Sequence, residues 1–145
     1  MNNECWQIAG GECLETQPEG YYGFIYMILD DKGRFYIGKK AFTHNKRKKI
    51  SKTARKKTNT RKRVQIDKVD SGWLNYWGSC KPLLEYIKQR GGTKGFKRYI
   101  LKFTLDKAST SYWEVFFQMR HEVLHTDKAW NTNILGRYYK TKIHE

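Results

Sequence analysis

Residues 23–38 read GFIYMILDDKGRFYIG, and two runs of aromatic and β-branched side chains flank the turn-forming sequence DDKG within them. Runs of this kind predict two β-strands, over 21–29 and 34–38. A three-residue loop with its glycine in the left-handed conformation would join the strands as an antiparallel hairpin. In this register Tyr26 and Tyr36 become diagonal neighbours on one face, because side chains alternate along each strand.

The rest of the chain predicts one more strand and two helices. Residues 96–104 alternate apolar and polar side chains in their second half, which is typical of a strand. A proline and a glycine pair bound a helix over 82–90. A second helix is expected over 109–125, with Ser111 and Glu114 as a capping box. These elements predict an α+β fold with a small three-stranded antiparallel sheet flanked by helices.

Length and composition set the domain organisation. The 145 residues fit a single domain, and we expect an acidic N-terminal arm over 1–19 followed by one domain over 20–145. No apolar run approaches the ~20 residues of a membrane span, and no signal peptide is visible. The cysteines are odd in number and lack CxxC spacing, which predicts a reducing, cytoplasmic compartment and free thiols at Cys5, Cys13 and Cys80.

The positive charge is concentrated in one segment. The formal net charge is +15, and residues 39–70 hold 14 basic side chains against two acidic ones, a net +12. Such a block cannot form a core, and it favours a polyanion whose counterions it displaces. A localisation signal or a solvated loop is the alternative. We expect a basic insertion after the second strand that contacts nucleic acid through Lys40, His44, Lys46, Lys48, Lys49, Arg55, Lys56, Lys57, Arg61, Lys62 and Arg63.

Several blocks of the sequence resemble the GIY-YIG nuclease family. Gly23-Phe24-Ile25-Tyr26 and Tyr36-Ile37-Gly38 look like its paired signature. Trp73-x-x-Tyr76-x-Gly78-Ser79 is similar to a block in phage-encoded members. Ser111-Tyr112-Trp113-Glu114 and the pair Trp130-Asn131 fall where the family has its glutamate helix and its asparagine. The ordered blocks cover nearly the whole chain.

The resemblance implies a DNA endonuclease that hydrolyses phosphodiester bonds with Mg²⁺ or Mn²⁺. Tyr26 and Tyr36 would line the site, one of them helping to activate the attacking water. Glu114 would bind the metal, and Asn131 would hold the site geometry or the phosphate. A cation after the second strand would stabilise the charged transition state, and the candidates, in order, are Arg47, Lys39 and His44. The resemblance is to free-standing, homing-type phage nucleases, which implies the host cytoplasm if the chain is phage-encoded, and a homodimer on DNA is possible.

Two other classes of function compete with this interpretation. A non-catalytic nucleic-acid-binding protein would share the basic segment but would not need Tyr26, Tyr36 and Glu114. His121-Glu122-Val123-Leu124-His125 is an HExxH sequence on the predicted second helix, as in zinc proteases. The charged residue two positions after His125 and the basic segment both count against a protease.

Overall fold

The predicted hairpin forms one side of the sheet. The computed structural model describes residues 4–144, and in it β3 (Gly23–Leu29) pairs antiparallel with β4 (Phe35–Ala41). Gly33 has φ of 81°, as the three-residue loop requires. The predicted register is confirmed, because Tyr26 lies opposite Gly38, two residues from Tyr36 on the same face, and the tyrosine rings are 6.1 Å apart.

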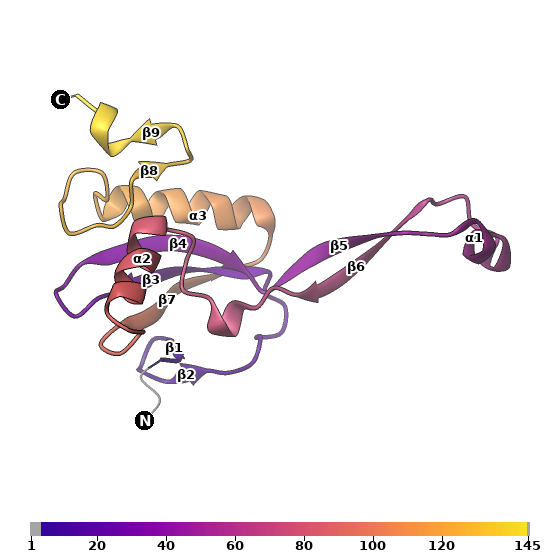
Figure 1. Ribbon diagram of the computed structural model, residues 1–145, viewed down its shortest axis with the longest axis horizontal. Helices are drawn as coiled ribbons and strands as arrows, with labels where there is room; N and C mark the ends of the chain where they lie inside the picture. The colour runs from indigo at the N-terminus through magenta and orange to yellow at the C-terminus, as the bar shows by residue number, and fades with distance from the viewer. Residues whose placement is uncertain (1–3, 145) are drawn as a thin grey trace.

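The sheet is larger than predicted. It has five strands in the order β2-β1-β7-β3-β4 (Figure 1). The third expected strand is β7 (Lys97–Thr104), which pairs antiparallel with β3. Two further strands, β1 (Trp6–Gln7) and β2 (Cys13–Leu14), come from the segment expected to be an irregular arm. Because β1 runs parallel to β7, the sheet is mixed, and the prediction of three purely antiparallel strands was wrong.

The N-terminal strands belong to the sheet because Trp6 belongs to the core. Its side chain is fully buried, and its ring lies 5.0 Å from that of Phe24 and 5.2 Å from that of Tyr26. The indole nitrogen donates a 2.7 Å hydrogen bond to the Trp73 carbonyl. A two-residue strand carries no alternation, so this long-range packing left no pattern in the sequence.

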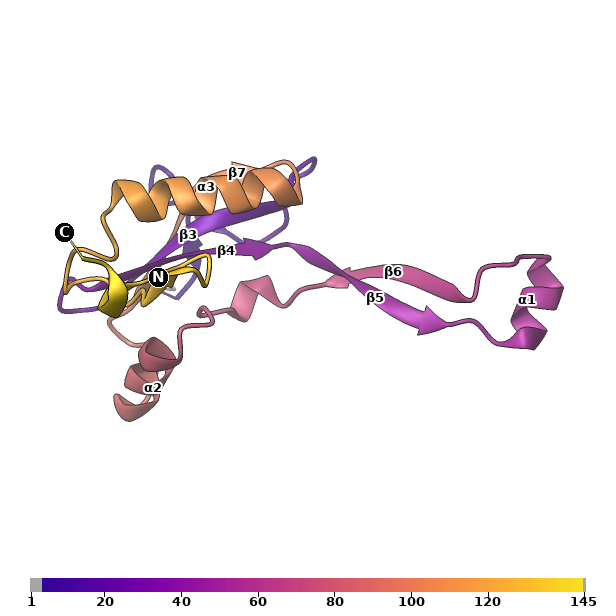
Figure 2. The same ribbon diagram turned by 90° about the horizontal axis from the view of Figure 1, so that it is seen from above.

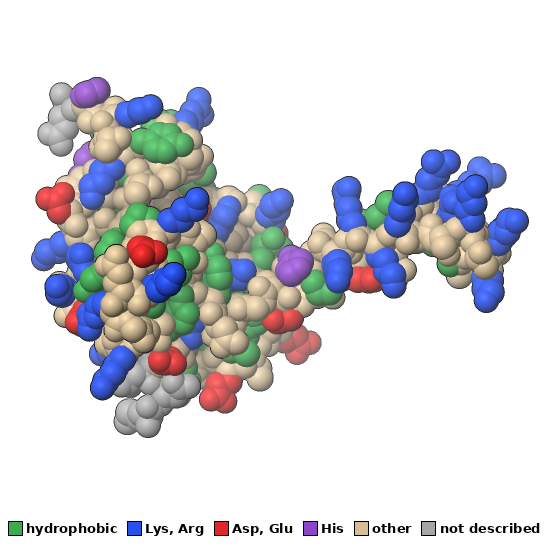
Figure 3. Space-filling model, in the orientation of Figure 1, with side chains coloured by type: hydrophobic (Ala, Val, Ile, Leu, Met, Phe, Trp, Pro, Cys, Tyr) green, Lys and Arg blue, Asp and Glu red, His purple; other side chains and the backbone are tan. Residues whose placement is uncertain are grey.

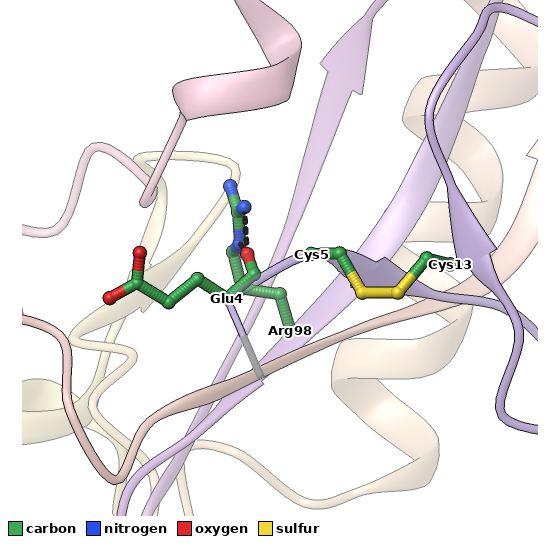
Figure 4. Close-up of a disulfide and its surroundings, with 4 residues drawn as sticks. All are labelled: Glu4, Cys5, Cys13 and Arg98. Atoms are coloured by element: carbon green, nitrogen blue, oxygen red, sulfur yellow. Dashed lines mark hydrogen bonds between the residues drawn. A yellow bond between two sulfur atoms is a disulfide. The ribbon is translucent and has the colours of Figure 1, made fainter. Parts of the chain in front are cut away.

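A disulfide joins Cys5 to Cys13 and ties β1 to β2 (Figure 4). The prediction of free thiols was therefore wrong for these two cysteines, whereas Cys80 is free as predicted. The two partners come together because the tight β1–β2 hairpin sets their Cα atoms 5.6 Å apart. Beside the bridge, the Arg98 guanidinium donates to the backbone carbonyl of Glu4 (Figure 4).

Two helices lie on opposite sides of the sheet (Figure 2). The helix predicted over 82–90 is α2 (Lys81–Gln89), with proline in its first turn. The other is α3 (Lys107–Arg120), which begins earlier than predicted because the Asp106 side chain accepts from the Ser109 amide at 2.7 Å. The predicted capping box at Ser111 and Glu114 was therefore wrong, and both residues lie inside the helix.

Alternation along β3 divides the interior into two clusters. One face of the sheet packs against α2 and the short helix η1 (Trp73–Asn75), and its buried side chains include Phe24, Tyr26, Ile28, Phe42, Trp73 and Leu83. The opposite face packs against α3 and the segment that follows it, and its buried side chains are Ile25, Ile37, Val123, Leu124, Ala129 and Ile134. β4 contributes to both clusters, through Tyr36 on one face and Ile37 on the other, and it is an edge strand of the sheet.

The basic insertion is a long arm that projects from the end of β4 (Figure 1). It consists of β5 (Thr43–Lys49), α1 (Lys52–Thr58) and β6 (Val64–Asp70), with β5 and β6 paired antiparallel as a two-stranded ribbon. Lysine and arginine side chains cover the arm from end to end (Figure 3). The position of the insertion follows the prediction, and the ribbon shows that it is more than a loop.

The C-terminal segment adds a small hairpin, β8 (Asn133–Ile134) and β9 (Tyr138–Tyr139), and the short helix η2 (Lys140–Lys142). Among residues 4–144, no helix has both the length and the apolar character needed to cross a bilayer.

Candidate active site

A groove of about 470 Å³ runs along the outer edge of β4. Three parts of the chain, distant in sequence, form its walls: the start of α2, the second half of α3, and the segment before and within the C-terminal hairpin. Its lining includes one strand residue from the predicted site and polar groups from each wall: Tyr36, Ser79, Lys81, Glu114, Gln118, Asn131, Thr132 and Asn133. The structure therefore brings Tyr36, Glu114 and Asn131 together, as the resemblance implied.

Asn131 closes the hydrogen bonding of the β4 edge. The segment beside β4 first pairs through its backbone, where the Trp130 amide donates to the Phe35 carbonyl at 2.7 Å. At the next position the Asn131 side chain, rather than its backbone, bonds to β4. Its Oδ1 accepts from the Ile37 amide at 3.1 Å, and its Nδ2 donates to the Ile37 carbonyl at 2.9 Å. Asn131 is 3% exposed, so it fixes the strand that carries Tyr36 rather than reaching into solvent.

Glu114 and Lys39 meet one step further along the same edge. The half-buried Glu114 carboxylate accepts from the Lys39 backbone amide. The Lys39 ammonium donates to the Ser111 hydroxyl at 2.8 Å, one helical turn before Glu114. Burial raises the pKa of the Glu114 carboxyl, and the charge of Lys39 partly offsets this rise. The pair therefore places an anion and a cation side by side at the groove.

The two motif tyrosines occupy different depths. Tyr36 lines the groove, where the Ser79 side chain is a hydrogen-bond partner of its phenol. Burial raises the pKa of Tyr36 to about 12 despite that bond, so the phenol is neutral at pH 7. Tyr26 lies beneath it, 1% exposed, and burial raises its pKa well above the usual value of 10.0. Its hydroxyl bonds to Tyr76, so Tyr26 supports the groove without lining it.

The need for glycine at position 38, in the Tyr36-Ile37-Gly38 motif, has a steric explanation. A Cβ atom at Gly38 would lie 2.5 Å from the Tyr26 hydroxyl and 3.0 Å from the Tyr36 ring. Side-chain atoms do not approach this closely, so any larger residue would push the two tyrosines apart. Gly38 therefore allows both rings to pack on one face of the sheet.

The three candidate cations lie in two places. Lys39 is beside Glu114, whereas Arg47 and His44 are on β5 in the arm, opposite Ile66 and Val69 of β6. The structure thus does not bring Arg47 to the groove. Among the predicted nucleic-acid contacts, Lys40 lies on β4 and outside the arm, with its Nζ 4.1 Å from the centre of the Tyr76 ring. The others lie on the arm: His44, Lys46, Lys48, Lys49, Arg55, Lys56, Lys57, Arg61, Lys62 and Arg63.

Gln118 is a site residue that the sequence interpretation missed. It is 5% exposed, and its Nε2 donates to the Ile37 carbonyl at 3.1 Å, beside the Asn131 bond. Its spacing of four residues places it one turn after Glu114 on the same face of α3. That face is turned toward β4, because an outer strand leaves backbone groups that polar side chains must satisfy.

The oxygen atoms at the groove suit a hard divalent cation. The carboxylate is Glu114, and the hydroxyl and amide groups of Thr132 and Asn133 are neighbours in the lining. Mg²⁺ is commonly held by one or two carboxylates, with water and substrate phosphate completing its coordination. A groove that offers one carboxylate and room for a phosphate fits that donor set.

The HExxH sequence does not form the helical site of a zinc protease. Helix α3 ends at Arg120, and Glu122 turns the chain with φ of 51°. His121 and His125 are therefore not one turn apart on a helix, which is the geometry that the motif needs. Within residues 4–144, no three side chains among His, Cys, Asp and Glu gather closely enough to bind a metal.

Comparison with known families assigns the class of the protein. The chain carries a GIY-YIG endonuclease domain, matched over residues 6–143 by the family model described as "Putative endonuclease segE, GIY-YIG domain". The chain therefore belongs to the SegE family of GIY-YIG domains. Searches of curated proteins and of solved structures found no match.

Proposed function

We propose that the protein is a DNA endonuclease that hydrolyses phosphodiester bonds in the groove at the β4 edge, with Mg²⁺ or Mn²⁺ as its metal. The family match supports an endonuclease. The observation that carries the proposal is the meeting of Tyr36, Lys39, Glu114 and Asn131 at one edge. The basic arm beside the groove provides the charge to hold a nucleic acid.

Each groove residue has a task in this reaction. Glu114 holds the metal, which supplies Lewis-acid stabilisation of the charge on the phosphate. The ammonium group of Lys39 adds positive charge on the same side of the groove, and electrostatic stabilisation of this kind is a large part of catalysis. Tyr36 keeps its proton at neutral pH, so its hydroxyl can donate to a phosphate oxygen or orient the attacking water.

The supporting residues keep these groups in place. Asn131 and Gln118 fix the backbone of β4 on either side of Ile37, and Tyr26 fills the space under Tyr36. Preorganisation matters because small displacements of reacting groups reduce rates strongly. One groove attacks one phosphodiester, so a single copy nicks one strand, and cutting both strands takes a second copy or a second encounter.

The test is conversion of supercoiled plasmid by the purified protein with Mg²⁺, with Mn²⁺ or with EDTA. The wild type should nick DNA only with a divalent metal, and Glu114→Gln should abolish nicking while DNA binding persists. Glu19→Gln makes the same charge change at an exposed position outside the groove, and it should cut like the wild type. If the wild type binds DNA and never cuts it, the protein is a non-catalytic binding protein and the proposal fails.

A second comparison identifies the cation that acts in catalysis. Lys39→Gln and Arg47→Gln each remove one positive charge, the first beside Glu114 and the second on the arm. At saturating protein, the cutting rate should fall in Lys39→Gln and stay near the wild-type rate in Arg47→Gln. The reverse result would return the catalytic role to Arg47.

A further inference from the structure

The ribbon of the arm has two faces of different composition. Directly paired residues share a face of an antiparallel ribbon, so the register defines both faces. The Arg47 face, as we name it, carries Asn45, Arg47 and Lys49 of β5 with Val64, Ile66 and Lys68 of β6. The opposite Lys46 face carries His44, Lys46 and Lys48 with Gln65, Asp67 and Val69.

The Arg47 face mixes three cations and an amide with exposed apolar groups. Ile66 is 57% exposed and Val64 is 42% exposed, although both are β-branched and apolar. The acidic residue at the base of this face, Asp70, accepts from the Gly72 amide at 2.8 Å and faces its own turn. On the Lys46 face, Asp67 reduces the net charge and accepts from Gln65 at 2.9 Å.

The arm has no core of its own among the described residues. The side chains from His44 to Lys49 are all exposed, and α1 buries none of its residues. A two-stranded ribbon open on both faces is marginally stable in water. Exposed apolar side chains set between cations call for a partner that is negatively charged at its margins and partly apolar within. Charge complementarity therefore selects a nucleic acid groove as the occupant.

We propose that the ribbon lies in the DNA major groove with its Arg47 face toward the base edges, and that this contact selects the bases beside the cut. The major groove is about 12 Å wide and admits a two-stranded ribbon, whereas the minor groove, about 6 Å wide, does not. The selection of a cutting position rests on the proposed nuclease function. The groove contact itself does not.

The side chains of the Arg47 face match the base edges of the major groove. Arginine pairs with the two acceptors of guanine, and asparagine pairs with adenine. Ile66 and Val64 can contact the methyl group of thymine, which the major groove alone presents. Such contacts read a short block of bases, because Arg47 and Asn45 are the residues on this face with fork-shaped or paired polar groups.

The tip of the arm has a different task. Residues 51–63 carry seven cations and no acidic residue: Lys52, Arg55, Lys56, Lys57, Arg61, Lys62 and Arg63. Two hollows at the tip share Lys52, Arg55 and Arg63 in their lining. Clustered cations of this kind hold phosphates without reading sequence. The tip therefore anchors the arm on the phosphates of the DNA backbone, and the Arg47 face contacts the bases.

The length of the ribbon limits the distance between the bases that it contacts and the phosphodiester that is cut. Each strand has seven residues, which at about 3.3 Å per residue spans about 23 Å. One turn of DNA is about 34 Å, so the ribbon covers about two thirds of a turn. Because the arm starts where β4 ends, the selected bases should lie within about one helical turn of the cut.

Two double variants with the same loss of charge test the proposal. Arg47→Gln with Lys49→Gln alters the Arg47 face, and Lys46→Gln with Lys48→Gln alters the other face of the same strand. All four side chains are exposed, so the fold should be unaffected. Base preference is measured by selecting bound duplexes from a randomised library. Glu114→Gln is present throughout, so that no cutting occurs and the result is independent of the nuclease claim.

The expected result separates the two faces. The unaltered ribbon should prefer one base over the others by at least about fivefold at one or more positions. The Arg47-face variant should lose this preference, and the Lys46-face variant should keep it. Both variants should bind DNA more weakly than the unaltered ribbon, and by a similar amount. Because each removes two cations, the slope of binding against salt concentration should fall by up to about 1.8.

Four outcomes would overturn the proposal. Equal preference in the two double variants, or no preference before the changes, would make the arm a phosphate clamp only. Dimerisation in solution that Ile66→Ala abolishes would make the Arg47 face a protein interface instead. In a selected site that contains thymine, uracil can replace it and so remove only the methyl group. If affinity is then fully retained, Ile66 and Val64 do not contact that methyl group, and their placement in the groove is wrong.

Discussion

Replacing Asn131 with alanine would open the edge of β4. The side chain is 3% exposed and makes two hydrogen bonds, to the amide and to the carbonyl of Ile37. Ile37 is itself fully buried, and its amide has the Asn131 side chain as its partner. The substitution therefore leaves a backbone donor unsatisfied in a low-dielectric site.

The size of the effect follows from which bonds remain. In Asn131→Ala the Ile37 carbonyl keeps its bond from Gln118, at 3.1 Å, so the main loss is the bond of the Ile37 amide. A buried donor left unpaired costs about 1–3 kcal/mol. Some loss of packing adds to this figure, and we expect the free energy of unfolding to fall by about 2–3 kcal/mol.

The assay is urea unfolding followed by tryptophan fluorescence, since five tryptophans report on the fold. Asn133→Ala is the matched control, because the Asn133 amide bonds only locally, to Thr132 and to the turn amide of Gly136. It should cost less than about 1 kcal/mol. If Asn131→Ala unfolds with the same free energy as the wild type, or as Asn133→Ala, then Asn131 does not fix the β4 edge and our reasoning is refuted.

Three further predictions rest on the same contacts. Gly38→Ala should lower the melting temperature and the cutting rate, because its Cβ would lie 2.5 Å from the Tyr26 hydroxyl; unchanged values would show that the tyrosines adjust freely. Burial raises the pKa of Glu114 above 4.5, so the stability that its protonated form provides should be lost as pH rises through that raised pKa. Metal binding should weaken as pH falls through the same range, and in Glu114→Gln both dependences should be smaller, as titration calorimetry and thermal melts across pH can check. Reducing the Cys5–Cys13 bridge, which spans eight residues, should destabilise the fold by about 2–3 kcal/mol in the absence of DNA; equal melting with and without reductant would contradict this.

The central hairpin was predictable because its signals are local. Two runs of aromatic and β-branched residues mark the strands, and one glycine in the loop between them sets the register of β3 and β4. The same holds for α2, whose proline and following glycines mark its ends. These features depend on neighbours in sequence, so no knowledge of the tertiary structure was needed.

The missed elements depend on distant contacts. Trp6 joins the core only because β7 and η1 offer a place for its ring, 67 residues away at the Trp73 carbonyl. Gln118 and Glu114 face the sheet because β4 is an outer strand with backbone groups to satisfy. Neither the order of strands nor the edge position of β4 can be read from periodicity alone.

For the site, the family resemblance supplied candidate residues, and the structure shows how they are arranged. Tyr36, Glu114 and Asn131 line one groove, and Tyr26 lies beneath Tyr36. The choice between Arg47 and Lys39 could not be made from spacing, because it depends on where the chain leaves the sheet. It leaves at Ala41, which carries Arg47 out along the arm and keeps Lys39 at the edge.

The central claim is that the groove at the β4 edge cuts DNA through Glu114. The most direct measurement is single-turnover cutting of an end-labelled duplex that is first bound to excess protein without metal and then started with Mg²⁺. We predict that Glu114→Gln binds the duplex as tightly as the wild type and cuts it at least about a hundredfold more slowly, whereas Glu19→Gln cuts at the wild-type rate. Cutting by Glu114→Gln at the wild-type rate would contradict the account.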